Sequence, residues 1–182
     1  MIKQIFSKYK FPALMSFVLA IVIIALKLES SPLNIALIIL GSFLGVFILD
    51  LDYIFYTFLV DPKHYFSKNV SDFLRSKKFG SAFVYIQHHK KELRHMPLHS
   101  ALFQTCLIIL CFYTLISTQS IFGKTLILST LIQSFFEQAE DYAEDKNLNN
   151  WFWVLKVKPT KNFLIGYFST LFVGFLYLLS LI

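Results

Sequence analysis

The segment "PLNIALIILGSFLGVFILDLDY", from Pro32 to Tyr53, joins a long apolar run to two closely spaced aspartates. Its apolar part, Leu33–Leu51, has about the length that a helix needs to cross the hydrocarbon core of a bilayer, ~20 residues. Within it, "GSFLG" (Gly41–Gly45) has the small-xxx-small spacing that lets membrane helices approach closely. The segment predicts a spanning helix that packs through its glycines and ends in the carboxylates Asp50 and Asp52.

The rest of the chain has the same character. Of its 182 residues, 56% are hydrophobic and 15% are charged, whereas about a quarter of the residues in soluble domains are charged. Four further apolar stretches predict spans at about 11–28, 98–116, 121–143 and 163–182. We therefore expect an all-α integral membrane bundle of about five transmembrane helices. It would form a single domain over residues 1–182, with a basic cytoplasmic loop at 61–97.

The distribution of Lys and Arg predicts the orientation of these helices. Cytoplasmic loops carry an excess of positive residues close to the ends of the spans. With the N-terminus in the cytoplasm and five spans, every Lys and Arg except Lys27 and Lys124 falls on the cytoplasmic side. The charges thus predict a multi-pass protein of the inner (plasma) membrane, with its C-terminus outside.

Two features predict contact with the membrane surface. The Asp61–Gly80 segment combines Phe66 and Val70 with lysines at a roughly helical period. It reads equally as an amphipathic helix held on the inner leaflet by anionic lipid and as a solvated basic loop. Trp151 and Trp153, which precede the last span, fit the aromatic belt at a membrane interface.

Ionisable residues from three spans meet at the cytoplasmic end of the predicted bundle. Asp50 and Asp52 end the second span, and their spacing places them on different faces of a regular helix. His99 lies at the start of the third span, where Pro97 favours the first helical turn. Glu137 and Asp141 share one face at the end of the fourth span. Carboxylates close to lipid require a positive partner, which is either a divalent metal or the basic residues Lys90, Lys91 and Arg94.

At these residues the chain resembles the membrane-bound metal-dependent hydrolases, also described as LexA-binding inner-membrane-associated hydrolases. That family has a "PDxDH"-like end to an early span, a "HRGxTHS" turn into a later span, and "HxxxD" on the next. The counterparts here are "LDLDY" (Leu49–Tyr53), "RHMPLHS" (Arg94–Ser100) and "EQAED" (Glu137–Asp141). They keep the family's order along roughly residues 33–160. The chain departs from the pattern at Leu49, at Tyr53, at Glu137 where histidine is usual, and in the exchanged order of Arg94 and His95.

The family is similar to zinc-dependent phospholipases C and single-strand nucleases, which implies hydrolysis of a phosphoester or lipid-like substrate at the cytoplasmic face. One or two divalent ions (zinc, manganese or magnesium) would be held by Asp50, Asp52, His99, Glu137 and Asp141. The loss of imidazoles in favour of carboxylates shifts the expected metal toward manganese or magnesium. Glu140 or His95 would move the proton. The residues expected to bind the substrate phosphate are Lys90, Lys91 and Arg94, of which Arg94 would also assist catalysis.

Two other classes of protein fit the same residues. In a non-enzymatic membrane scaffold or adaptor, the polar cluster would be a structural salt-bridge network, and the basic loop would bind a cytoplasmic protein partner. In a transporter, intramembrane acids would mark an ion path, but here the acids lie at one end of the bundle. Membrane lipids are expected partners in every case, and the sequence has no nucleic-acid-binding motif.

Overall fold

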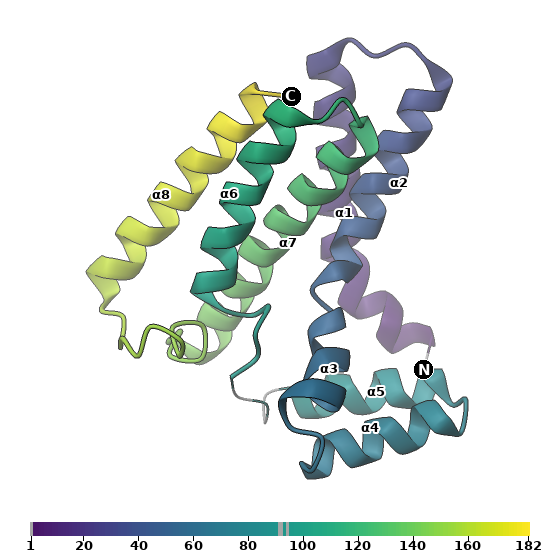
Figure 1. Ribbon diagram of the computed structural model, residues 1–182, viewed down its shortest axis with the longest axis vertical. Helices are drawn as coiled ribbons and strands as arrows, with labels where there is room; N and C mark the ends of the chain where they lie inside the picture. The colour runs from purple at the N-terminus through teal and green to yellow at the C-terminus, as the bar shows by residue number, and fades with distance from the viewer. Residues whose placement is uncertain (1, 91–92, 94) are drawn as a thin grey trace.

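The computed structural model describes residues 2–90, 93 and 95–182, and its regular structure within these residues is helical (Figure 1). The long helices α1 (Ile2–Lys27), α2 (Pro32–Ile48), α6 (Ala101–Ser117), α7 (Ile121–Asp145) and α8 (Lys161–Ser180) form the bundle. Shorter elements gather at one end of it. They are α3 (Leu51–Phe55), the π-helical turn η1 (Tyr56–Val60), α4 (Tyr65–Arg75) and α5 (Phe79–His89).

The two glycines of "GSFLG" lie in a close contact between α2 and α7. A Cβ atom on Gly45 would lie 2.5 Å from the carbonyl oxygen of Leu126 and 2.5 Å from Cβ of Ser129. A Cβ on Gly41 would collide with the hydroxyl of Thr125. Across the same contact, the Ser129 hydroxyl donates a hydrogen bond to the carbonyl oxygen of Ser42. The packing role predicted for these glycines is confirmed.

The centre of the bundle is apolar and draws on all five long helices. Its buried residues include Leu19 and Ile23 of α1, Ile38 of α2, Leu128 of α7 and Phe175 of α8. The outer faces also carry large apolar side chains, and Ile109, Phe172 and Val173 are each more than half exposed. An exposed apolar surface of this extent needs an apolar environment.

Within the part of the chain that the structure describes, three segments are long and apolar enough to cross a membrane: Tyr9–Lys27, Pro32–Val60 and Lys161–Ser180. They indicate a membrane protein, and the five spans expected from the sequence are confirmed only to this extent. Helix α6 has 17 residues and is shorter than the three candidate spans. Helix α7 lies at the centre, and its polar side chains, such as Thr125, Ser129 and Gln133, are buried against neighbouring helices. The low hydropathy of α7 therefore comes from polar side chains that are buried inside the protein, and few of them would face lipid.

The basic segment folds into a helical hairpin. The expected amphipathic helix is α4, and α5, which was expected to be loop, packs against it. Phe66 and Val70 on the apolar face of α4 are buried against α5 and against Tyr53 and Tyr56. The apolar face predicted to lie on the inner leaflet is therefore covered by the protein itself.

Helix α6 begins later than predicted. We expected it to start near Pro97, but its first residue is Ala101 and its N-cap is Ser100, whose hydroxyl accepts a hydrogen bond from the amide of Phe103 at 3.1 Å. The amides of Leu98 and His99 donate instead to Asp52. These two residues are thereby held outside the helix.

Candidate functional site

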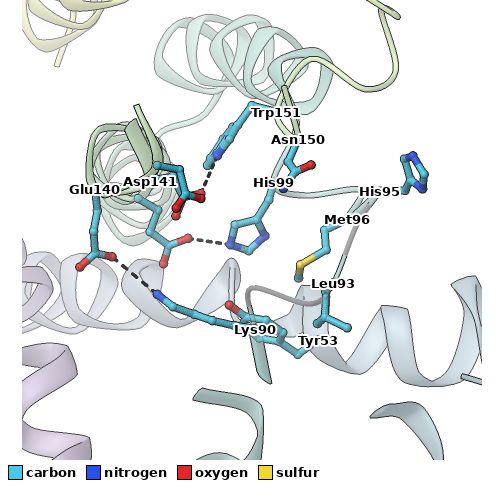
Figure 2. A pocket seen from close by; sticks show the side chains of 12 residues that line it. Tyr53, Lys90, Leu93, His95, Met96, His99, Glu140, Asp141, Asn150 and Trp151 are labelled. Carbon is cyan, nitrogen blue, oxygen red and sulfur yellow. Dashed lines mark hydrogen bonds and ion pairs between the residues drawn. The ribbon is translucent and has the colours of Figure 1, made fainter. Parts of the chain in front are cut away.

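A pocket with a volume of about 80 Å³ opens at the end of the bundle where α3, the loop before α6 and the last turns of α7 meet. Figure 2 shows its walls, and three of the predicted segments contribute to them. His99 comes from the loop, and Tyr53 from α3. Helix α7 supplies the carboxylates Glu137, Glu140 and Asp141. The expectation that these three segments meet at one end of the protein is confirmed for these residues.

Asp52 anchors the site although it does not line the pocket. Its side chain is 0% exposed. One carboxylate oxygen, Oδ2, accepts hydrogen bonds from the amide of Leu98 at 2.8 Å, the amide of His99 at 3.0 Å and Nδ1 of His99 at 2.8 Å. The other oxygen, Oδ1, is buried and has no hydrogen-bond partner among the described residues. Asp52 therefore sets both the backbone and the ring orientation of His99.

The series of hydrogen bonds that begins at Asp52 continues through His99 to α7. Its Nε2 lies 2.8 Å from Oε2 of Glu137, and the other oxygen of Glu137 accepts a hydrogen bond from the Gln133 amide at 2.8 Å. Burial lowers the pKa of His99, but its hydrogen bonds to Asp52 and Glu137, and the charges of these two acids, outweigh burial and raise the pKa from 6.5 to about 10. The two carboxylates therefore favour the protonated form of the imidazole, and a divalent ion that bound at Nε2 would have to displace the proton there.

Asp141 is held by a residue that the sequence analysis placed elsewhere. The indole nitrogen of Trp151 donates a hydrogen bond to Oδ2 of Asp141 at 2.7 Å. Trp151 is 2% exposed and packs with Leu148 and Phe152. Its assignment to an aromatic belt at the membrane surface is therefore wrong. A buried indole needs a hydrogen-bond acceptor, but the sequence does not show which carboxylate supplies it.

Asp50 faces a different part of the protein from Asp52. It accepts a hydrogen bond from the hydroxyl of Tyr9 on α1, whose ring lies 5.0 Å from that of Phe47. The two aspartates thus point to different sides, as their spacing predicts. Sequence reasoning missed Tyr9, because no motif links the start of the first helix to the end of the second.

The other described candidates, Lys90, Glu140 and His95, also line the pocket. Nζ of Lys90 is 3.9 Å from Oε2 of Glu140, and the two side chains are 25% and 42% exposed. His95 is exposed, and its ring packs edge-on against Trp153 at 4.9 Å. It points away from the other labelled side chains (Figure 2). Arg94 and Lys91, expected to bind substrate, lie outside the described residues.

The five residues expected to hold a metal are only partly brought together. Among residues 2–90, 93 and 95–182, no group of three or more His, Cys, Asp or Glu side chains is arranged as a metal site. Asp50 bonds to Tyr9 and Asp141 to Trp151, while His99 bridges Asp52 and Glu137. His99, Glu137 and Asp141 carry nitrogen and oxygen atoms of the kind that bind divalent ions, but in this arrangement they bond to other protein groups. In metal sites, the ring nitrogen of a histidine that does not bind the metal usually donates a hydrogen bond to a carboxylate. Asp52 makes a hydrogen bond of this kind with Nδ1 of His99.

The fold and the pocket together define a helical membrane protein with a polar site at one end of its bundle. No family model matches the chain, and neither a curated protein nor a solved structure matches it significantly.

Proposed function

We propose that the protein is a membrane-bound, metal-dependent hydrolase that cleaves a phosphoester of a lipid or of another molecule at the cytoplasmic face. One observation carries the proposal. Buried Asp52 orients His99 so that Nε2 faces Glu137, on the same helix as Asp141, at the wall of a pocket. The motifs that resemble those of the hydrolase family contain these same four residues.

Each pocket residue has a role in this proposal. His99, Glu137 and Asp141 would hold the metal, and Asp52 would keep the imidazole ring in place from behind. The bound metal would lower the pKa of a water molecule and polarise a phosphoryl oxygen. Asp50, through its bond to Tyr9, would tie the end of α2 to α1. Two of the three proposed ligands, Glu137 and Asp141, are carboxylates, which favours manganese or magnesium over zinc.

Two further residues would handle the proton and the substrate. Glu140 lines the pocket one turn from Glu137 and would accept the proton of the attacking water. Lys90, paired with Glu140, would turn its ammonium group to the substrate phosphate. A buried water needs about 10–15 Å³, so a pocket of about 80 Å³ has room for several waters or for a phosphate group. The rest of the substrate would stay outside the pocket.

The metal part of the proposal is tested by elemental analysis of the purified protein in detergent after exposure to zinc, manganese or magnesium. We expect at least one bound divalent ion per chain, and tenfold or greater loss of affinity in His99→Ala and in Asp141→Asn. Glu144→Gln is the matched control, because Glu144 is an exposed acid on the same helix. Unchanged metal affinity in both site variants would refute the site. Hydrolysis of a chromogenic phosphodiester, lost in the same two variants only, would support the activity.

The proposal includes a five-span topology in the inner membrane. Helices α6 and α7 share the apolar core with the three candidate spans, which supports counting them as spans. We expect Ser120→Cys, with Cys106 and Cys111 replaced by Ala, to react with an impermeant thiol reagent on intact cells. Ser76→Cys, in the basic hairpin, should react only after the membrane is opened. Labelling of Ser76→Cys on intact cells would place the pocket on the outer face and exclude a cytoplasmic substrate.

A non-enzymatic scaffold is the second candidate, and a specific observation favours it. Both ring nitrogens of His99 contact carboxylates, and Asp141 and Glu140 already have partners in Trp151 and Lys90. A network of this kind stabilises the junction of three segments without a metal. The melting temperature distinguishes the hydrolase from the scaffold, because a metal ion that binds only the folded state raises the melting temperature. A melting temperature that is unaffected by divalent metals or by a chelator, but falls in His99→Ala, would favour the scaffold.

A further inference from the structure

The surface of α3 and η1 carries an apolar stripe of residues that do not line the pocket. Leu51, Ile54, Phe55, Phe58 and Leu59 follow the three- and four-residue spacing of one helix face, and all are more than 40% exposed. The most exposed is Leu59, at 71%. The residues between them face inward, where Asp52, Tyr53, Tyr56 and Thr57 are buried. A continuous exposed stripe of large apolar side chains marks a contact with lipid or with another apolar surface.

The length of the apolar segment places this stripe in the bilayer. The segment from Pro32 to Val60 has 29 residues, which form α2, a turn at Leu49 and Asp50, α3 and η1. At 1.5 Å per residue the segment spans at most ~43 Å, which exceeds the hydrocarbon core and matches the bilayer with its headgroup layers, about 40–45 Å. If α2 enters the membrane near Pro32, η1 ends at the level of the headgroups on the far side.

A basic surface follows directly after the stripe. The hairpin of α4 and α5 lies across the end of the bundle beside α3 (Figure 1). The apolar face of α4 is already buried, with Phe66 at 0% exposed, so this face does not insert into lipid. What the hairpin presents instead are exposed cations and, next to them, the exposed rings of Tyr65 and Phe79. The cations are Lys63, Lys68, Arg75, Lys77 and Lys78.

We infer that the apolar stripe and these five cations form one lipid-docking surface, which binds the phosphates of anionic phospholipids in the leaflet that surrounds the pocket. The stripe lies among the acyl chains, and the cations lie one layer further out, on the headgroups. Charge complementarity selects anionic lipid, because each Lys or Arg close to an anionic leaflet strengthens binding by roughly fivefold. The exposed aromatic rings suit the interface between the two layers. The inference goes beyond the proposed hydrolase and does not depend on a metal.

The test uses full-length protein in nanodiscs of phosphatidylcholine, with and without phosphatidylglycerol. A single cysteine at Leu59, Ser76 or Ser120, in a background with Cys106 and Cys111 replaced by Ala, carries a nitroxide label. We compare how often the label collides with oxygen, which concentrates in lipid, and with a water-soluble nickel complex. We expect the Leu59 label to be open to oxygen and shielded from nickel in both lipids. The Ser76 label should become more shielded from nickel when phosphatidylglycerol is present, whereas the Ser120 control should not change.

Charge variants separate headgroup binding from other causes. Replacing Arg75, Lys77 and Lys78 by Gln should abolish the effect of phosphatidylglycerol on the Ser76 label, and Lys77→Arg with Lys78→Arg should preserve it. These side chains are exposed, so the fold is expected to be unaffected. A Leu59 label as open to nickel as the Ser120 label would overturn the inference. Equal shielding of the Ser76 label from nickel in the two lipids would also overturn the inference. It would indicate instead that the basic hairpin binds an acidic protein partner.

Discussion

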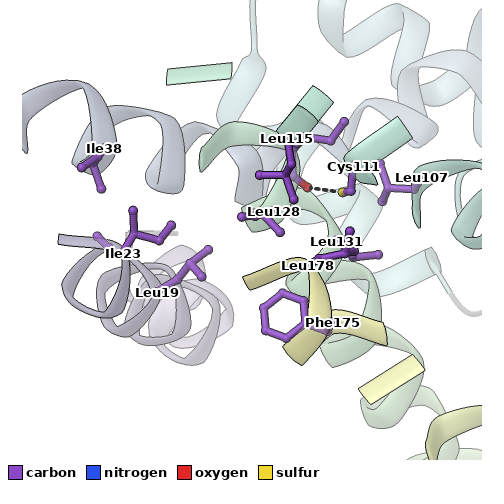
Figure 3. Close-up of a cluster of buried hydrophobic side chains, with 12 residues drawn as sticks. Leu19, Ile23, Ile38, Leu107, Cys111, Leu115, Leu128, Leu131, Phe175 and Leu178 are labelled. Carbon is purple, nitrogen blue, oxygen red and sulfur yellow. Dashed lines mark hydrogen bonds between the residues drawn. The ribbon is translucent and has the colours of Figure 1, made fainter. Parts of the chain in front are cut away.

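The centre of the bundle and its polar end are held together by different kinds of interaction. In the centre, apolar side chains from all five long helices interlock, and the labelled side chains of Figure 3 make one hydrogen-bond contact, between Cys111 and the carbonyl oxygen of Ile127. At the polar end, Asp52, His99, Glu137 and Trp151 each have a named hydrogen-bond or ionic partner. Packing in the centre depends on shape, and many apolar residues satisfy it. The polar end depends on individual atoms, so single substitutions should act differently in the two regions.

The largest effect is expected at Asp52. Asp52→Ala leaves two backbone amides and the buried His99 ring without their acceptor. Removing one partner of a buried ionic pair costs about 3–5 kcal/mol, and we expect a loss of that size in the free energy of unfolding, measured by denaturation in mixed micelles. Asp50→Ala is the matched control and should cost less, because Asp50 is only half-buried and accepts its bond from Tyr9. Equal losses would mean that the polar end is not organised around Asp52.

A smaller effect is expected where the centre is tightest. Gly45→Ala forces a methyl group against the backbone of Leu126, and overpacking of this kind costs about 1–3 kcal/mol. Gly166→Ala on α8 is the same change at a helical glycine whose added Cβ would meet nothing within 4 Å. It should be neutral or stabilising by up to about 1 kcal/mol, through helix propensity. The same denaturation experiment compares them, and a destabilised Gly166→Ala would indicate an unrecognised contact on α8.

The smallest effect on stability is expected at the rim of the pocket. Lys90 and Glu140 are partly exposed, and such pairs contribute less than about 1 kcal/mol. Lys90→Gln should therefore leave the unfolding transition nearly unchanged. Under the proposed function it should instead raise KM for a phosphoester several-fold, while Lys158→Gln, at an exposed cation outside both the pocket and the hairpin, should not. A change in stability without a change in KM would assign Lys90 to the structural network.

The sequence by itself determined the features that follow from local pattern. Apolar run length located the long helices to within a few residues at most ends, because hydrophobic length is a property of each segment alone. The spacing in "GSFLG" predicted a close helix contact, and the spacing of Asp50 and Asp52 predicted their divergence. The order of the predicted spans also placed His99, Glu137 and Asp141 at one end of the bundle, because spans of alternating direction bring these positions to the same depth.

Only the tertiary structure decided how those residues pair. The late start of α6 follows from Asp52 capturing two backbone amides 46 and 47 residues away, an interaction that no local pattern contains. The same holds for the bonds of Trp151 to Asp141 and of Tyr9 to Asp50. The hairpin partner of α4 was missed because α5 carries its apolar residues in a weakly amphipathic sequence that acquires a partner only in the fold. A hydrogen bond needs two atoms within about 3 Å in a defined direction, and that condition is met by the packing of the helices rather than by the order of residues along the chain.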